Sequence, residues 1–194
     1  MNPIFQFPNY LLRRQAIALT GKFRFYDPAG RLVMFSEQKM FRLKEDIRIY
    51  GDESKTQEVL SVRARQIMDF SAAYDVVDTE MNQKVGALRR KGWSSLARDS
   101  WMLLNARDQE IGTVVEDSMI AALVRRFVDA ASLFMPQKFH ADMGGQTVCT
   151  YQQNFNPFVR RLTVDFTHDR NGQLDKRLGL AAAILLSAIE GKQG

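Results

Sequence analysis

The chain contains one cysteine and two histidines, and these small numbers exclude several kinds of site. With Cys149 alone, no internal disulfide can form, and nothing indicates an oxidising compartment. A structural zinc site needs four ligands, usually cysteines and histidines, which Cys149, His140 and His168 cannot supply. We therefore expect no metal or other cofactor, and the cytoplasm is the default location.

Motifs for catalysis are also lacking. The sequence has no G-x-S-x-G, no H-E-x-x-H, no Walker loop and no G-x-G-x-x-G. His140 lies in an expected strand, where a hydrogen-bonded structural histidine is favoured over a catalytic base. Asp165 and Asp169 flank His168, which leaves general acid–base chemistry open but unsupported. The sequence therefore favours a protein that is not an enzyme.

No hydrophobic run is long enough to cross a bilayer. The longest, LGLAAAILLSAI at residues 178–189, rises about 18 Å as a helix, whereas a bilayer core is about 30 Å thick. Extending it would bury charges such as Arg177 or Glu190, each costing about 2.5–3.5 kcal/mol near the bilayer centre. Its apolar residues cover every side of the helix, which is typical of an enclosed helix. We predict a buried helix over residues 176–190.

Paired apolar segments joined by short polar turns predict β-hairpins. Pro28 and Gly30 of the DPAG sequence suit a tight turn, and Gly86 and Gly112 suit bulges or close backbone approaches. Many short strands with regular turn signals indicate a β-sandwich or a barrel. The hairpins are expected over residues 23–35, 74–91 and 101–117, with a fourth across Gly144 and Gly145.

One further helix is expected near residues 118–131, where apolar residues recur at helical spacing. Without a Pro-, Gly- or Ser-rich linker, residues 1–194 are expected to form a single domain. The first eight residues contain two prolines and are expected to be poorly ordered.

Positive charge is concentrated in the first quarter of the chain. The net charge of +5 lies wholly within residues 1–50, because the remainder is neutral as a whole. A second basic cluster, Arg89, Arg90 and Lys91, is followed by Trp93. Basic surfaces attract anionic lipid headgroups. A solvated barrel exterior would show the same pattern, so both interpretations stand.

Near the C-terminus, Asp169, Asn171 and Asp175 form a weak calcium-binding candidate. The set lacks the full number of ligands and the closing glutamate of a calcium loop. A turn leading into the last helix explains these residues better.

Taken together, the hairpin sequences and the closing DKRLGLAAAILLSAIE resemble the tubby-like superfamily, specifically the LURP-one-related proteins and the phospholipid scramblases. The resemblance covers about Tyr10 to Ala188. It implies a mainly β fold, a twelve-stranded antiparallel barrel enclosing a hydrophobic C-terminal helix. Tubby domains bind phosphoinositide headgroups through basic residues of the barrel wall, but no motif transfers those residues to this chain.

Scramblases are credited with calcium-dependent lipid movement, for which the segment before the last helix is a poor match here. Lys176 and Arg177 stand where acidic residues would be expected, and the palmitoylated cysteines have no counterpart. The favoured function is therefore peripheral association with anionic phospholipids at the inner membrane surface, through Arg89, Arg90, Lys91 and Trp93. The alternatives are a protein-interaction module and a small-ligand carrier or enzyme with a site at a barrel mouth. Nucleic acid is not an expected partner.

Overall fold

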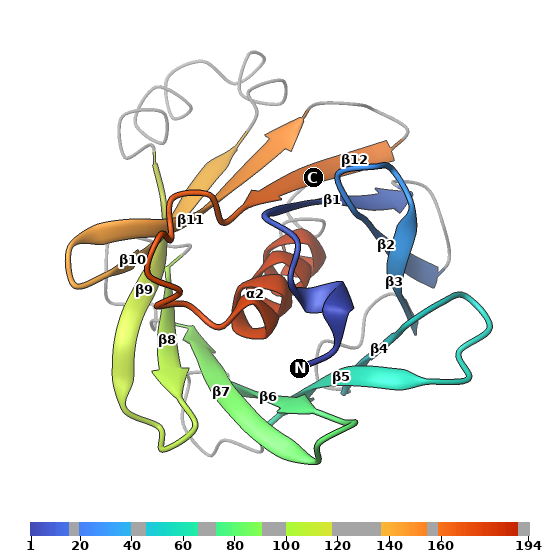
Figure 1. Ribbon diagram of the computed structural model, residues 1–194, viewed down its shortest axis with the longest axis horizontal. Helices are drawn as coiled ribbons and strands as arrows, with labels where there is room; N and C mark the ends of the chain where they lie inside the picture. The colour runs from blue at the N-terminus through green and yellow to red at the C-terminus, as the bar shows by residue number, and fades with distance from the viewer. Residues whose placement is uncertain are drawn as a thin grey trace.

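The computed structural model describes residues 1–15, 20–39, 46–65, 73–90, 100–117, 137–154 and 159–189. Within them, twelve antiparallel strands form a closed barrel around a single central helix (Figure 1). Each strand pairs with its neighbours in sequence, and β1 pairs with β12 to close the ring. The predicted barrel with an enclosed C-terminal helix is confirmed.

The elements follow one another with short turns at every second connection. The strands are β1 (Asn9–Gln15), β2 (Thr20–Tyr26), β3 (Leu32–Lys39), β4 (Ile47–Tyr50), β5 (Glu58–Ala64), β6 (Ala73–Asp78), β7 (Gln83–Arg90), β8 (Trp101–Asn105), β9 (Glu110–Glu116), β10 (Lys138–Met143), β11 (Gln146–Asn154) and β12 (Val159–Asp165). A 3-10 helix, η1 (Pro3–Phe5), precedes them, and α2 (Lys176–Ile189) follows.

Because consecutive strands alternate in direction, the barrel has two ends of different construction. Even-numbered strands finish at what we call the turn end, where short turns lead from β2 to β3, β4 to β5, β6 to β7, β8 to β9 and β10 to β11. Odd-numbered strands finish at the opposite end, which we call the connection end. Helix α2 begins at the turn end and runs through the barrel towards the connection end.

Helix α2 forms the centre of the hydrophobic core. Leu178 and every residue from Leu180 to Leu186 are at most 3% exposed. They pack with inward-facing side chains of the strands, such as Phe25, Phe139 and Tyr151. Gly179 allows the helix to approach Phe166, the residue that follows β12, since a Cβ at position 179 would lie 2.5 Å from a ring carbon of Phe166. The apolar surface on all sides of the helix is thus accounted for by contact with the barrel wall.

The predicted close backbone approaches at glycines in the hairpins are also present. A Cβ at Gly86 would lie 2.4 Å from the carbonyl oxygen of Leu104, and one at Gly112 would lie 2.3 Å from that of Asp142. The register shifts beside Gly86, between Val76 and Val77, as at a β-bulge. Glycine is required at both positions because the neighbouring backbone leaves no room for a side chain.

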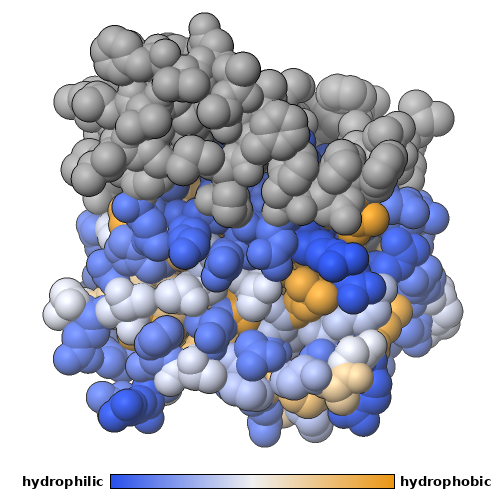
Figure 2. Space-filling model, turned by 90° about the horizontal axis from the view of Figure 1, so that it is seen from above, coloured by the Kyte–Doolittle hydropathy of each residue, from blue (hydrophilic) through white to orange (hydrophobic). Residues whose placement is uncertain are grey.

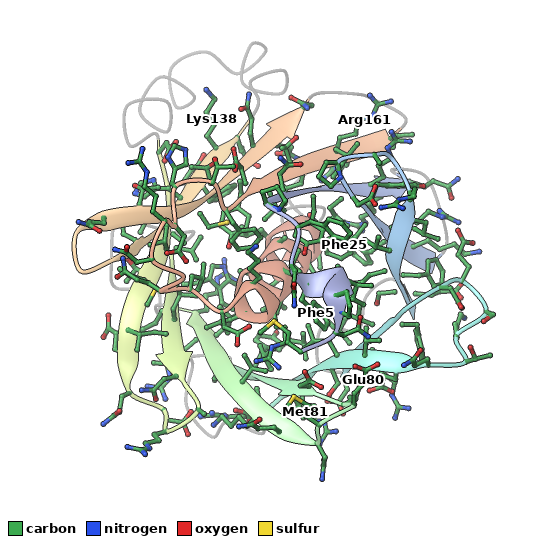
Figure 3. The ribbon with its side chains drawn as sticks, viewed as in Figure 1. Phe5, Phe25, Glu80, Met81, Lys138 and Arg161 are labelled. Carbon is green, nitrogen blue, oxygen red and sulfur yellow. The ribbon has the colours of Figure 1, made fainter. Side chains whose placement is uncertain are left out.

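The N-terminal segment, for which we expected poor order, contacts the start of the central helix. Residues Pro3–Phe5 form η1, and Phe5 is fully buried beside the start of the central helix (Figure 3). The Lys176 ammonium donates hydrogen bonds to the carbonyl oxygens of Gln6 and Phe7, at 2.9 and 3.0 Å. Phe5 and these bonds hold the segment across the turn end.

Two further expectations concern membrane and helix content. No helix among the described residues is long and apolar enough to cross a bilayer. The helix expected near residues 118–131 lies outside the described residues.

We predict that Leu185→Asp unfolds the protein, because it places an unpaired charge inside the barrel. A buried charge without a partner costs about 3–5 kcal/mol. This is a large part of the roughly 5–15 kcal/mol by which a typical domain is stable. Met81→Asp is the control, since Met81 is 56% exposed. Thermal unfolding followed by circular dichroism should show loss of the cooperative transition in the first variant only. A soluble Leu185→Asp protein with an unchanged midpoint would contradict the enclosed position of α2.

Candidate functional site: the basic end of the barrel

Charged side chains of the described residues are unevenly divided between the two ends. With each residue assigned to the end of its strand or turn that it lies nearer, cations outnumber acids at the connection end. The cations there are Arg13, Arg14, Lys22, Arg48, Arg63, Arg65, Arg89, Arg90, Lys138, Arg160 and Arg161, and the acids are Glu37, Asp46, Asp75, Glu116 and Asp117.

At the turn end the balance is reversed. The acids of the described residues there are Asp27, Asp52, Glu53, Glu58, Asp78, Glu80, Asp108, Glu110, Asp142, Asp165, Asp169 and Asp175, and the cations are Arg24, Arg31, Lys55, Lys84, Arg107, Arg170, Lys176 and Arg177. The barrel is therefore electrically polar along its axis. The visible part of one side wall is mostly hydrophilic, with scattered hydrophobic residues (Figure 2).

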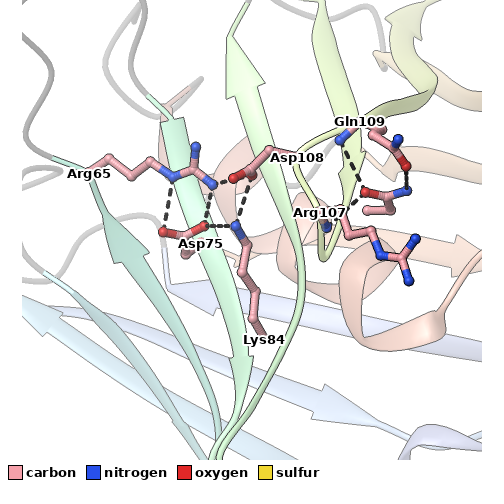
Figure 4. A network of polar contacts seen from close by, with 7 residues as sticks. Arg65, Asp75, Lys84, Arg107, Asp108 and Gln109 are labelled. Atoms are coloured by element: carbon pink, nitrogen blue, oxygen red, sulfur yellow. Dashed lines mark hydrogen bonds and ion pairs between the residues drawn. The ribbon is translucent and has the colours of Figure 1, made fainter.

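Some of the cations are neutralised by neighbouring carboxylates. Arg65 and Lys84 both bind Asp75 and Asp108 in a compact network on the wall (Figure 4). The Lys84 ammonium lies 2.8 Å from Asp108 and 3.0 Å from Asp75. Hydrogen bonds from Lys84 and Arg65 lower the pKa of Asp108. Because two cations meet two carboxylates, this network is a structural cross-link and a poor candidate for binding an external anion.

The basic cluster predicted from the sequence, Arg89, Arg90, Lys91 and Trp93, lies only partly within the described residues. Arg89 and Arg90 end β7 at the connection end, opposite Met102 and Trp101 of β8, and both are half-buried. Lys91 and Trp93 lie outside the described residues. The structure thus places two of the four predicted residues on the basic end, and whether they contact lipid stays a prediction.

A second basic cluster, which we had not predicted, lies across the barrel from β7. It consists of Arg13, Arg14, Arg160 and Arg161, and we call it the arginine seam because it joins the first strand to the last. Arg13 is paired in register with Arg161, and Arg14 with Arg160. Like charges directly opposite each other destabilise a sheet. Repulsion between the paired arginines of the seam therefore opposes the pairing of β1 with β12 that closes the barrel.

The two pairs of the seam face opposite sides of the wall. Leu12 and Leu162 are paired and buried, so Arg14 and Arg160, two positions along their strands, face the barrel interior. Arg13 and Arg161 face outwards. The guanidinium of Arg13 lies 4.7 Å from the centre of the Tyr26 ring, and Arg161 projects from the rim (Figure 3).

The seam was not predicted, although the sequence contains a signal for it. Arg-Arg occurs in LLRRQ, at the end of the first strand, and again in VRRLT, at the start of the last. In an antiparallel pair these positions lie at the same end. Knowledge that the first and last strands close the barrel would have brought the two dipeptides together.

The weak calcium candidates are engaged within the chain. Asp169 accepts hydrogen bonds from the backbone N–H groups of Gln173 and Leu174, both at 2.8 Å. Asp175 accepts from the backbone and guanidinium of Arg177, which also binds the buried Asp78 at 2.6 Å. Among the residues described, no three acidic, histidine or cysteine side chains are placed to hold a metal ion. This arrangement fits the predicted turn into α2.

His140 also has a structural environment. One ring nitrogen contacts the carboxylate of Asp117, and the other lies 3.2 Å from Asp142.

A hollow of about 240 Å³ occurs elsewhere on the wall and is lined by Asp46, Arg48, Glu58, Ser61 and Arg63. Both of its arginines bind neighbours within it, since Arg48 lies 3.6 Å from Glu58 and Arg63 donates to Ser61. Both places bring groups of complementary charge or hydrogen-bonding character together, whereas the seam sets arginine opposite arginine.

Comparison with known proteins gives one match. The sequence profile of the family described as LURP-one-related matches residues 32–186, which is most of the barrel and nearly all of α2. No curated protein matches the chain.

We predict that calcium binds weakly or not at all, because the carboxylates before α2 are occupied by hydrogen bonds within the chain. Calorimetric titration with calcium chloride should give no binding in the micromolar range. Asn171 makes no hydrogen bond that would be lost on substitution, so Asn171→Ala is the informative variant. Micromolar affinity in the wild type that disappears in Asn171→Ala would show a calcium site and contradict this prediction.

Proposed function

The chain belongs to the LURP-one-related family, and from this premise we propose that it is a non-enzymatic protein that binds anionic phospholipid surfaces. The connection end of the barrel would face the lipid. The protein would then lie at the inner surface of a membrane without entering its core.

The observation that carries this proposal is the charge polarity of the barrel. A net charge of +5 spread evenly would produce only weak, unoriented attraction. Here cations outnumber acids among the described residues at one end, while acids outnumber cations at the other. An anionic surface attracts the first end and repels the second, so the protein would be both bound and oriented.

The strength of this attraction follows from the number of cations that reach the surface. Each Lys or Arg close to an anionic membrane contributes about 1 kcal/mol, and the effect is screened within roughly 10 Å at 0.1 M salt. Arg161 and Lys138 are exposed at the connection end and project from the wall (Figure 3). Together with Arg89 and Arg90, they are enough for reversible binding and too few for permanent attachment.

We predict that the protein floats with vesicles containing phosphatidylglycerol but not with pure phosphatidylcholine vesicles, and that high salt releases it. The double variant Arg161→Gln/Lys138→Gln should bind about 30-fold more weakly, because two contributions of about 1 kcal/mol are lost. Thermal stability should hardly change, since both side chains are exposed.

The matched control removes the same charge from the other end. Arg107 and Arg170 are exposed at the turn end, so Arg107→Gln/Arg170→Gln should bind nearly as well as the wild type. Equal weakening of the two double variants would show that net charge alone matters, against an oriented surface. If the wild type fails to bind anionic vesicles even at low salt, the lipid proposal is wrong, and the protein-interaction alternative takes its place.

A further inference from the structure

Three arginines of the seam, Arg14, Arg160 and Arg161, line a small pocket at the connection end. The pocket lies between strands β1, β11 and β12 and the last turn of α2. Gln153 and Ser187 add polar groups, and leucines of the strands and helix form its apolar side. It thus combines three cations with an amide and a hydroxyl group in one place.

Arg14 has a structural role that explains its position. Its Nη1 donates a hydrogen bond to the carbonyl oxygen of Ser187, at 2.6 Å. This carbonyl belongs to the C-terminal turn of α2, where the helix dipole is negative and a cation is favourable. Burial and repulsion from Arg160 nevertheless lower the pKa of Arg14.

Arg160 has no such explanation. It is half-buried and directly opposite Arg14, yet its side chain forms no hydrogen bond or ion pair with the rest of the described chain. None of the acids described at the connection end lies on β11, β12, β1 or β2. Arg13 and Arg161 add two further cations on the outer side of the same strands. No described carboxylate on these strands therefore compensates the charge of Arg160.

The chemistry of the pocket selects for one kind of ligand. A guanidinium binds phosphate through two parallel N–H donors, which an ammonium cannot do. A phosphomonoester carries a charge of about −1.5 to −2 and three acceptor oxygens, more than a phosphodiester offers. The free volume of about 10 Å³ is close to that of a single water, which excludes a large ligand held inside and places the bound group at the mouth.

We propose that Arg160 and Arg14, at the mouth beside the end of α2, form a binding site for a single phosphomonoester group. The group could be carried by a lipid headgroup or by a soluble molecule. The lipid-borne case rests on the proposed function, since it requires the connection end to face the membrane. Gln153 and Ser187 would supply additional hydrogen bonds to the phosphate oxygens.

The first test compares vesicles containing phosphatidic acid, a phosphomonoester, with phosphatidylglycerol vesicles, a phosphodiester, at equal zeta potential. The wild type should bind phosphatidic acid about tenfold more tightly, as expected for one additional charge-assisted interaction. Arg160→Gln should lose this preference while still binding both vesicles. Arg63→Gln removes the same charge at the same end, away from the pocket, and should weaken both vesicles equally while keeping the preference.

The second test separates the lipid source from a soluble one. Inorganic phosphate should raise the melting temperature of the wild type, relative to chloride at equal ionic strength, and should not raise that of Arg160→Gln. Phosphate stabilisation without any vesicle binding would support the pocket and refute the proposed function. A phosphatidic acid preference without phosphate stabilisation would assign the site to lipid.

The melting temperatures of the Arg160 variants show whether Arg160 stabilises the fold. Arg160→Gln should melt at the same temperature as the wild type or higher, because it removes repulsion with Arg14. Arg160→Lys keeps the charge and should still lose most of the preference, because it lacks the guanidinium fork. Two results would overturn the proposal. In the first, the wild type binds both kinds of vesicle equally and phosphate does not change its melting temperature. In the second, the melting temperature falls by several degrees in both variants.

Discussion

The enclosure of an apolar helix by the barrel is the constraint on which the rest of the structure depends. Helix α2 has no polar face, so every side must meet apolar side chains, and only a closed ring of strands provides them. Closure in turn removes exposed strand edges. It also requires β1 to pair with β12, which places the first and last strands side by side and fixes the position of the arginine seam.

A binding site is best sought where the fold retains electrostatic repulsion that its stability does not require. The network of Arg65, Asp75, Lys84 and Asp108 pairs its charges, and Arg177 is paired with the buried Asp78. The seam instead sets Arg against Arg on adjacent strands. Such an arrangement lowers stability unless an anion is bound. The uneven distribution of the remaining charges supports the proposal that the same end of the barrel binds an anionic partner.

Much of the fold could be predicted from local sequence signals. The length and composition of residues 178–189 identified the enclosed helix, and Gly86, Gly112 and the turn residues identified the hairpins. The number of strands and the closure came from family resemblance, because sandwich and barrel share the same local pattern. The burial of Phe5 and the pairing of Arg14 with Arg160 depend on contacts between distant segments, which no local pattern contains.

The central claim, that the connection end faces an anionic membrane, can be measured with a fluorescent label. Cys149 is buried, and burial raises the pKa of its thiol, so an introduced surface cysteine would be the reactive one. Asn154→Cys labels the connection end and Met81→Cys the turn end, both at exposed positions. With an environment-sensitive probe and phosphatidylglycerol vesicles, we expect a blue shift at position 154 only. A shift at position 81, or equal shifts at both, would contradict the account.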